Sequence, residues 1–258
     1  SILQGEVAIP APGQRRPDFR LLRKPGRVSI KTPHLCNTKI GYIKSNDGIN
    51  WKSNAIRVVR LDGGNISSIG PLLYVDGIYK MWYSENDEIY YAATKNANSS
   101  IANMVLTKNE PVIKKDEGTA WDKDGVSVGS VLFEGGVYKM WYAGKSGDES
   151  KIGYAVSFDG EVWKKYAQNP VFDDETTSME TNPCIVHDAR EYKMYYTVKA
   201  GDDYYPVRLA TSADGITWKK YSDIPVLDTG EQTWEKSKVI VTKVEIMKKE
   251  ETTEKNKN

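Results

Sequence analysis

Cysteine and histidine are almost absent from this chain. It has two residues of each type among 258, and the cysteines, Cys36 and Cys184, lie far apart. Two distant cysteines form neither a disulfide framework nor the closely spaced pairs of a zinc site. Two histidines are too few for a histidine-based metal site. The sequence therefore predicts no metal site and no cofactor, and we expect both thiols to be buried or half-buried.

Net charge and long apolar runs are lacking as well. The chain has 36 basic and 35 acidic residues, and the basic residues are scattered. We therefore expect no nucleic acid and no anionic membrane as a partner. No apolar run approaches the roughly 20 residues that a membrane-spanning helix needs. No signal peptide is visible, which leaves open a cytoplasmic protein and a secreted one that has lost its signal. The sequence indicates no oligomeric state.

Two short motifs recur in a fixed order. Tyr-Lys-Met-Trp-Tyr occurs at 79–83 and 138–142, and Tyr-Lys-Met-Tyr-Tyr at 192–196. Their methionines, at 81, 140 and 194, are 59 and 54 residues apart. Ser-x-Asp-Gly-x-x-Trp occurs at 45–51, 157–163 and 212–218. Aromatic residues favour strands, and Asp-Gly favours a hairpin turn. A period of about 55 residues made of short strands and turns indicates a β-propeller with one four-stranded blade per repeat.

The repeat divides the chain into blades. The first four cover residues 16–59, 61–112, 119–172 and 173–227, and a fifth begins near Trp234, where 233–236 aligns without gaps on 120–123. In the first blade, a gapless shift of 112 residues onto the third blade predicts strands at 17–22, 27–30 and 40–42. The pattern stops after Met247. We therefore expect an all-β fold over residues 1–247. It should be a five-bladed propeller whose first blade has diverged in sequence and whose fifth blade is partial. The charged stretch 248–258 reads as a disordered tail. The alternative is four blades, with 239–247 pairing into the first.

Residues that recur with the period are expected to build the scaffold. Every blade needs the same large side chain at the same place, so the repeated tyrosines and tryptophans should pack one blade against the next. Asp47, Asp159 and Asp214 should hold turns by bonding to their own backbone. His187, which follows the predicted strand 184–186, is expected to be a loop residue. Chemistry should lie where the copies differ.

The run from Gly136 to Val171 resembles the five-bladed propeller glycosidases: the arabinanases, fructosidases and levansucrases, with the mannoside phosphorylases as close cousins. It reads Gly-x-Tyr-Lys-Met-Trp-Tyr, then Ile-Gly-Tyr-Ala-x-Ser-x-Asp-Gly-x-x-Trp, then Asn-Pro-Val. The similarity extends from about residue 16 to 247. It implies an enzyme that cleaves a glycosidic bond of an oligosaccharide or polysaccharide, by hydrolysis or phosphorolysis. The Asn-Asp-Pro-Asn-Gly signature of fructosidases is absent, which disfavours a fructose-specific enzyme.

The resemblance also implies where the catalytic residues lie. In this clan, carboxylates at the heads of the innermost strands converge on the central axis. Glu180, in Glu-Thr-Asn-Pro, resembles the clan's Glu-x-Pro segment and is the predicted acid. Asp124, ahead of the third inner strand, and Asp18, in the order Pro-Asp where the clan has Asp-Pro, are the predicted base or nucleophile. The predicted substrate-binding residues are Arg16, Ser127, Asn182 and Glu235.

A second hypothesis is a propeller without catalytic activity, serving as a carbohydrate-binding module or a scaffold. The head of the second inner strand, at 65–70, holds no carboxylate, and the first and fifth blades are incomplete. A set of converging carboxylates would favour the enzyme, and sugar binding without cleavage would favour the module.

Overall fold

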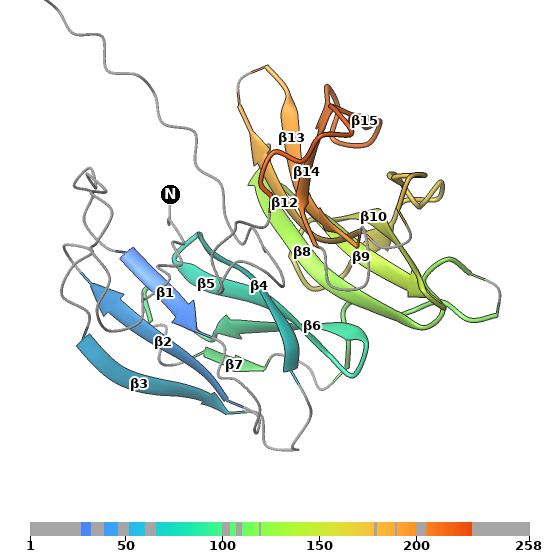
Figure 1. Cartoon of the computed structure of the whole chain (residues 1–258). Helices are drawn as coiled ribbons and strands as arrows, with labels where there is room; N and C mark the ends of the chain where they lie inside the picture. Colours follow the sequence, from blue (N-terminus) through green and yellow to red (C-terminus); the bar gives the residue numbers. More distant parts are fainter. Residues whose placement is uncertain are drawn as a thin grey trace, which may run out of the picture.

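The computed structural model contains strands and no helix in the residues that it describes (Figure 1). These are residues 27–31, 39–45, 52–59, 66–99, 104–106, 110–118, 120–177, 180–188, 190–199 and 205–228. The strands form four antiparallel sheets, which follow one another in chain order. The predicted all-β class is confirmed.

Each sheet is one blade, with its strands in sequence order from one edge to the other. The first is made of β1 (Arg27–Lys31), β2 (Lys39–Ser45) and β3 (Lys52–Val59). The second is made of β4 (Ile66–Val75), β5 (Ile78–Glu85), β6 (Glu88–Thr94) and β7 (Met104–Leu106). The third is made of β8 (Gly125–Glu134), β9 (Val137–Ser146), β10 (Glu149–Ser157) and β11 (Lys164–Lys165). The fourth is made of β12 (Glu180–His187), β13 (Tyr192–Val198), β14 (Val207–Ser212) and β15 (Lys219–Lys220).

The blade boundaries agree with the sequence period. Blades two to four each have four strands, as predicted, and β1 and β2 coincide with the second and third strands expected for the first blade. The inner strand expected at 17–22 and the fifth blade expected from Trp234 lie outside the described residues. Five blades therefore stay a prediction, with four as the alternative. Cys184 is buried, as expected.

The two recurring motifs meet at the seams between blades. The indole Nε1 of Trp82, on β5, donates to the carbonyl of Gly160 in the hairpin of the next blade, at 2.9 Å. Trp141, on β9, donates in the same way to Gly215, at 2.8 Å. Both indoles are completely buried. The expectation that the repeated aromatic residues pack blade against blade is therefore confirmed at the seams between blades two, three and four.

The repeated aspartates hold turns. Asp159 Oδ1 accepts hydrogen bonds from the backbone N–H groups two and three residues ahead, both at 2.8 Å, and Asp214 does the same at 2.8 and 2.7 Å. The N–H groups of Thr217 and Ile216 lower the pKa of Asp214 to about 2. Both aspartates are turn residues, as predicted, and Asp47 lies outside the described residues.

Each of the inner strands β4, β8 and β12 has a bulge at the same point of the repeat. The register shifts between Ile69 and Leu72, between Val128 and Ser130, and between Thr181 and Cys184. A bulge bends its strand and is frequent beside active sites. Gly129, at the second bulge, lies against the next blade, where Pro183 leaves no room for a side chain.

Gly129→Ala should destabilise the fold by about 1–3 kcal/mol, because overpacking forces neighbouring groups apart. A Cβ at this position would lie 2.4 Å from Pro183 Cγ and 2.7 Å from the Pro183 carbonyl oxygen, which is backbone. Chemical denaturation would measure the loss, with Ser127→Ala on the same strand as the matched control. A Gly129→Ala protein with the wild-type midpoint would show that the two blades are not in close contact here.

Candidate functional site

The starts of the inner strands lie at the same end of adjacent blades. β8 contacts β4 on one side and β12 on the other. Serine hydroxyls hold these strands in place across the seams. Ser84 Oγ accepts the backbone N–H of Val128, and Ser130 Oγ accepts that of Ile185, both at 2.8 Å. The relative placement of residues at the starts of β8 and β12 is therefore fixed by direct bonds between blades.

Glu180 is the first residue of β12 and pairs with Val198 of β13. The first five residues of β4 and of β8 are all uncharged. Among the described inner strands, a carboxylate therefore occurs in the first five residues of β12 alone. Glu180 lies at the place where the resemblance predicts the acid.

Asn182 shapes the chain directly after Glu180. It adopts a left-handed backbone conformation with φ of 53° and is half-buried within the bulge of β12. Asparagine tolerates this conformation better than most residues do. Its side-chain Nδ2 donates to Thr181 Oγ1 at 3.0 Å. This contact holds its amide beside the strand, and its role toward a substrate stays a prediction.

Asp124 precedes β8 and is exposed. Its Oδ2 accepts the backbone N–H of Gly147 at 2.6 Å, and its own N–H donates to the carbonyl of Lys145 at 2.9 Å. These bonds tie the β9–β10 turn to the start of β8. Asp124 therefore stabilises a turn. These contacts do not test its predicted role as the catalytic base, which stays a prediction. Ser127 lies half-buried on β8, while Asp18, Arg16 and Glu235 lie outside the described residues.

Two completely buried aspartates form a further charged feature that the sequence analysis did not find. Asp122 pairs with Lys165 at 2.7 Å, and Asp174 pairs with Lys220 at 3.1 Å and Arg208 at 2.8 Å. Both lysines occupy the same repeat position, two residues after the hairpin tryptophan. Each ion pair connects the segment that leads into a blade with the outermost strand of that blade.

These ion pairs bear on Glu235. The alignment of 233–236 on 120–123 places Glu235 on Asp122. Asp122 is buried and paired with Lys165. Glu235 itself lies outside the described residues, and its substrate-binding role stays a prediction.

Asp174→Asn should lower the free energy of unfolding by about 3–5 kcal/mol near neutral pH, because it leaves Arg208 and Lys220 without their shared anion. Burial opposes the ionisation of Asp174, but hydrogen bonds, above all from Arg208, outweigh it and hold its pKa below the ordinary 3.8. A carboxyl group of lowered pKa stabilises the fold above its unfolded pKa, and this contribution is lost as the pH falls.

The wild-type protein should therefore lose stability below about pH 4, and Asp174→Asn should lose less there. Urea unfolding at about pH 7 and about pH 3 would measure both effects. Asp173→Asn is the control, because its exposed pair with Lys151, at 2.7 Å, should contribute less than about 1 kcal/mol. If Asp174→Asn and Asp173→Asn lost equal free energy of unfolding at neutral pH, the buried ion pairs of Asp174 would contribute no more to stability than an exposed pair.

A second unpredicted cluster lies at the opposite end of β8 and β12. Glu134 accepts hydrogen bonds from Lys139 at 2.9 Å and Tyr192 at 2.7 Å, and lies 2.8 Å from His187 Nδ1. Partial burial opposes the ionisation of Glu134, but the bonds from Lys139, Tyr192 and His187 outweigh it and lower its pKa. His187 is the last residue of β12, so the expectation of a loop residue was wrong.

The stacking of His187 follows from the repeat. Its ring lies on Tyr192, the cross-strand partner, with centroids 3.7 Å apart. In the preceding blade, Phe133 lies on Tyr138 in the same cross-strand position, at 4.5 Å. His187 thus occupies an aromatic packing position of the blade.

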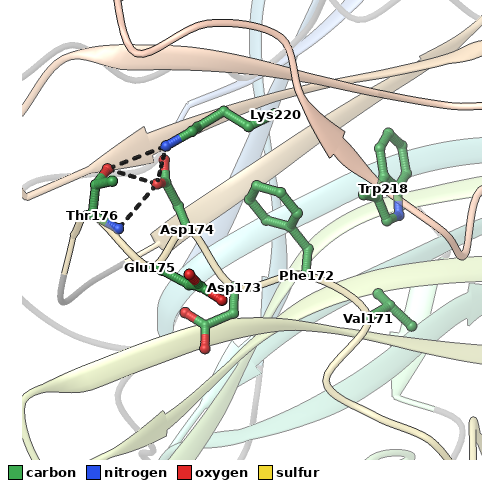
Figure 2. A pocket seen from close by; sticks show the side chains of 8 residues that line it. All are labelled: Val171, Phe172, Asp173, Asp174, Glu175, Thr176, Trp218 and Lys220. Atoms are coloured by element: carbon green, nitrogen blue, oxygen red, sulfur yellow. Dashed lines mark hydrogen bonds and ion pairs between the residues drawn. The ribbon is translucent and has the colours of Figure 1, made fainter.

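A pocket of about 370 Å³ lies away from the starts of the inner strands, at the outer seam between blades three and four (Figure 2). It is lined by Val171, Phe172, Asp173, Asp174, Glu175, Thr176, Trp218 and Lys220. Val171 and Phe172 pack beside β10, while Trp218 and Lys220 belong to the outer edge of the fourth blade. Asp124, the predicted catalytic residue whose side chain the structure describes, does not line this pocket.

The chain matches one family of proteins over most of its length. The family described as "Glycosyl hydrolases family 32 N-terminal domain" matches residues 64–254. The chain belongs to this family. The matched range of the family 32 domain includes Asp124, Ser127, Glu180, Asn182 and Glu235, whereas Asp18 and Arg16 precede it.

The curated relatives are longer than this chain. "Uncharacterized protein MT1551" and "Uncharacterized protein Rv1502", from two strains of Mycobacterium tuberculosis, are each 33% identical over 135 residues. The alignment covers 48% of this chain and 43% of each relative. The chain thus spans less than half the length of these relatives.

Solved structures share the fold of the family 32 domain. A "Glycoside hydrolase" is 17% identical with a TM-score of 0.60, over 78% of this chain and 68% of the other. A thermostable family-43 glycoside hydrolase is 15% identical with a TM-score of 0.60, over 81% and 72%. The family 117 glycoside hydrolase Zg3597 of Zobellia galactanivorans is 16% identical with a TM-score of 0.58, over 75% and 58%. The resemblance to the propeller glycosidases is confirmed at the level of the fold.

Proposed function

We propose that this family 32 domain cleaves a glycosidic bond of an oligosaccharide or polysaccharide, with Glu180 as the general acid. The observation that carries the proposal is the place of Glu180. It opens the inner strand β12 within the range matched by a glycosyl hydrolase family. The hydrogen bond from the Ile185 N–H to Ser130 Oγ and the bulge at Asn182 give this strand a fixed geometry, which an acid catalyst requires.

The chemistry needs a second carboxylate. One group protonates the leaving oxygen while the other acts as base or nucleophile, about 5–5.5 Å away for retention and 6.5–9.5 Å for inversion. Asp124 and Asp18 are the candidates. Oδ2 of Asp124 accepts a hydrogen bond from the Gly147 N–H. Its Oδ1 can still accept a proton or a hydrogen bond from water.

A panel of aryl glycosides and natural oligosaccharides, assayed with and without phosphate, tests the proposal. We expect product release and a bell-shaped dependence of kcat/KM on pH, because one carboxyl must be protonated and the other ionised. Turnover that depends on phosphate would identify a phosphorylase. A profile with a single limb would contradict the two-carboxylate mechanism.

A carbohydrate-binding domain without catalysis is the second candidate. The observation that favours it is the absence of carboxylates from the first five residues of β4 and β8, the other described inner strands. The same panel separates the candidates, since this one predicts saccharide binding with no product at any pH.

A further inference from the structure

The pocket at the outer seam has one aromatic wall that is held rigidly. The indole Nε1 of Trp218 donates to the carbonyl of Gly215 at 3.1 Å, and its ring meets Trp141 edge to face, with centroids 6.4 Å apart. The ring of Phe172 is almost fully buried and meets Tyr196 edge to face, with centroids 5.0 Å apart. In Figure 2 Phe172 lies between Trp218 and the polar residues. The pocket therefore combines an apolar side with a polar side.

The polar wall is held in place by a closed hydrogen-bond network. Thr176 Oγ1 donates to Asp174 Oδ1 at 2.7 Å and accepts from Arg208 at 2.7 Å. Lys220 donates to Asp174 at 3.1 Å and pairs with Asp223 at 2.6 Å. The positive charges of this wall are already matched by carboxylates. An anionic ligand would find no surplus positive charge here.

Glu175 differs from the other charged groups of the wall. It is exposed at the pocket, and no described residue forms a hydrogen bond or ion pair with it. Asp173, beside it in the chain, is paired with Lys151. Glu175 is thus a carboxylate that can accept hydrogen bonds from a ligand without losing a partner within the described part of the chain.

The neighbouring blade shows that this wall is not dictated by the repeat. In blade three the residue before the buried aspartate is Trp121, which packs on Tyr142 with centroids 5.7 Å apart. In blade four the residue before the buried aspartate is Asp173. The outer seam of blade four therefore carries a charged group where the scaffold of blade three has a packed indole.

We propose that this pocket is a second carbohydrate-binding site, which holds one or two rings of a saccharide of the same kind as the one cleaved at the start of β12. The inference rests on the proposed function for its ligand. Saccharides present C–H faces that lie against aromatic rings and hydroxyl groups that donate to carboxylates. A volume of about 370 Å³ is near the lower end of the range for small-molecule sites.

Calorimetric titration of the full chain tests this site. Xylotriose, arabinotriose and kestose serve as probes, in a Glu180→Gln background so that no probe is consumed. We expect one of them to bind at two sites. Glu175→Ala should weaken one of the two by about tenfold, the cost of a lost hydrogen bond to a charged group. Glu117→Ala, an exposed glutamate in the segment that leads into blade three, is the matched control and should leave both sites unchanged.

Three results would decide the matter. Unaltered binding in Glu175→Ala, or binding at a single site that Glu175→Ala leaves intact, would overturn the second site. Equal weakening by Glu117→Ala would also overturn it, because the effect would then be one of general charge. A site sensitive to Glu175 in a protein that cleaves no glycoside would support the pocket and refute the proposed function.

Discussion

Glu180→Gln should lower kcat/KM by about 10²–10⁴-fold for a glycoside with a poor leaving group, the range typical of a lost general acid. Glutamine keeps the size of the side chain but has no proton to give to the leaving oxygen. A glycoside whose leaving group needs no protonation, such as a dinitrophenyl glycoside, should lose much less. The ratio of the two rates in variant and wild type measures the acid role directly. The alkaline limb of the pH profile, which reports the deprotonation of the general acid, should disappear with it.

Two variants make this test specific. Glu149→Gln changes an exposed glutamate on β10 and should leave both rates unchanged. Asp124→Asn should slow both substrates if Asp124 is the base, because the base acts whatever the leaving group. Full activity of Glu180→Gln on the glycoside with the poor leaving group would show that another group supplies the proton. The melting temperature of each variant separates a chemical effect from unfolding.

The fold could be predicted in detail because its signals are local. A period of about 55 residues, Asp-Gly turns and aromatic strands all act within one blade, and the strands of blades two to four follow from them. The partners across a seam could not be predicted. Trp82 and Gly160 are 78 residues apart, and a repeat shows that both recur without showing that one bonds to the other.

The candidate site could be predicted only in part, because the direction of its side chains depends on contacts between residues far apart in the sequence. Asp122 and Asp124 are two residues apart in the segment before β8 and look equivalent in the sequence. Asp122 is completely buried against Lys165, whereas Asp124 is exposed and holds a turn. The direction in which each side chain points depends on the local turn and on a lysine far along the chain. Neither is visible in the composition of the segment.

The tryptophans at the seams should contribute strongly to the stability of the fold. Trp141→Ala should lower the free energy of unfolding by about 3–5 kcal/mol, because it removes a completely buried indole. Trp141→Phe keeps most of the ring but removes one of the two indole donors to the Gly215 carbonyl and leaves the bond from Trp218, which should cost about 1–1.5 kcal/mol. Urea unfolding followed by far-UV circular dichroism would measure both losses.

Tyr195 provides the matched control, because it occupies the same repeat position on β13 and is half-buried. Tyr195→Phe should change stability by less than about 1 kcal/mol. If the seams hold the blades together as one cooperative unit, Trp141→Ala should also split the single transition into two, since blades two and three would then unfold apart from blade four. Similar losses for Trp141→Phe and Tyr195→Phe would mean that the bond across the seam contributes little and that burial of the ring alone couples the blades.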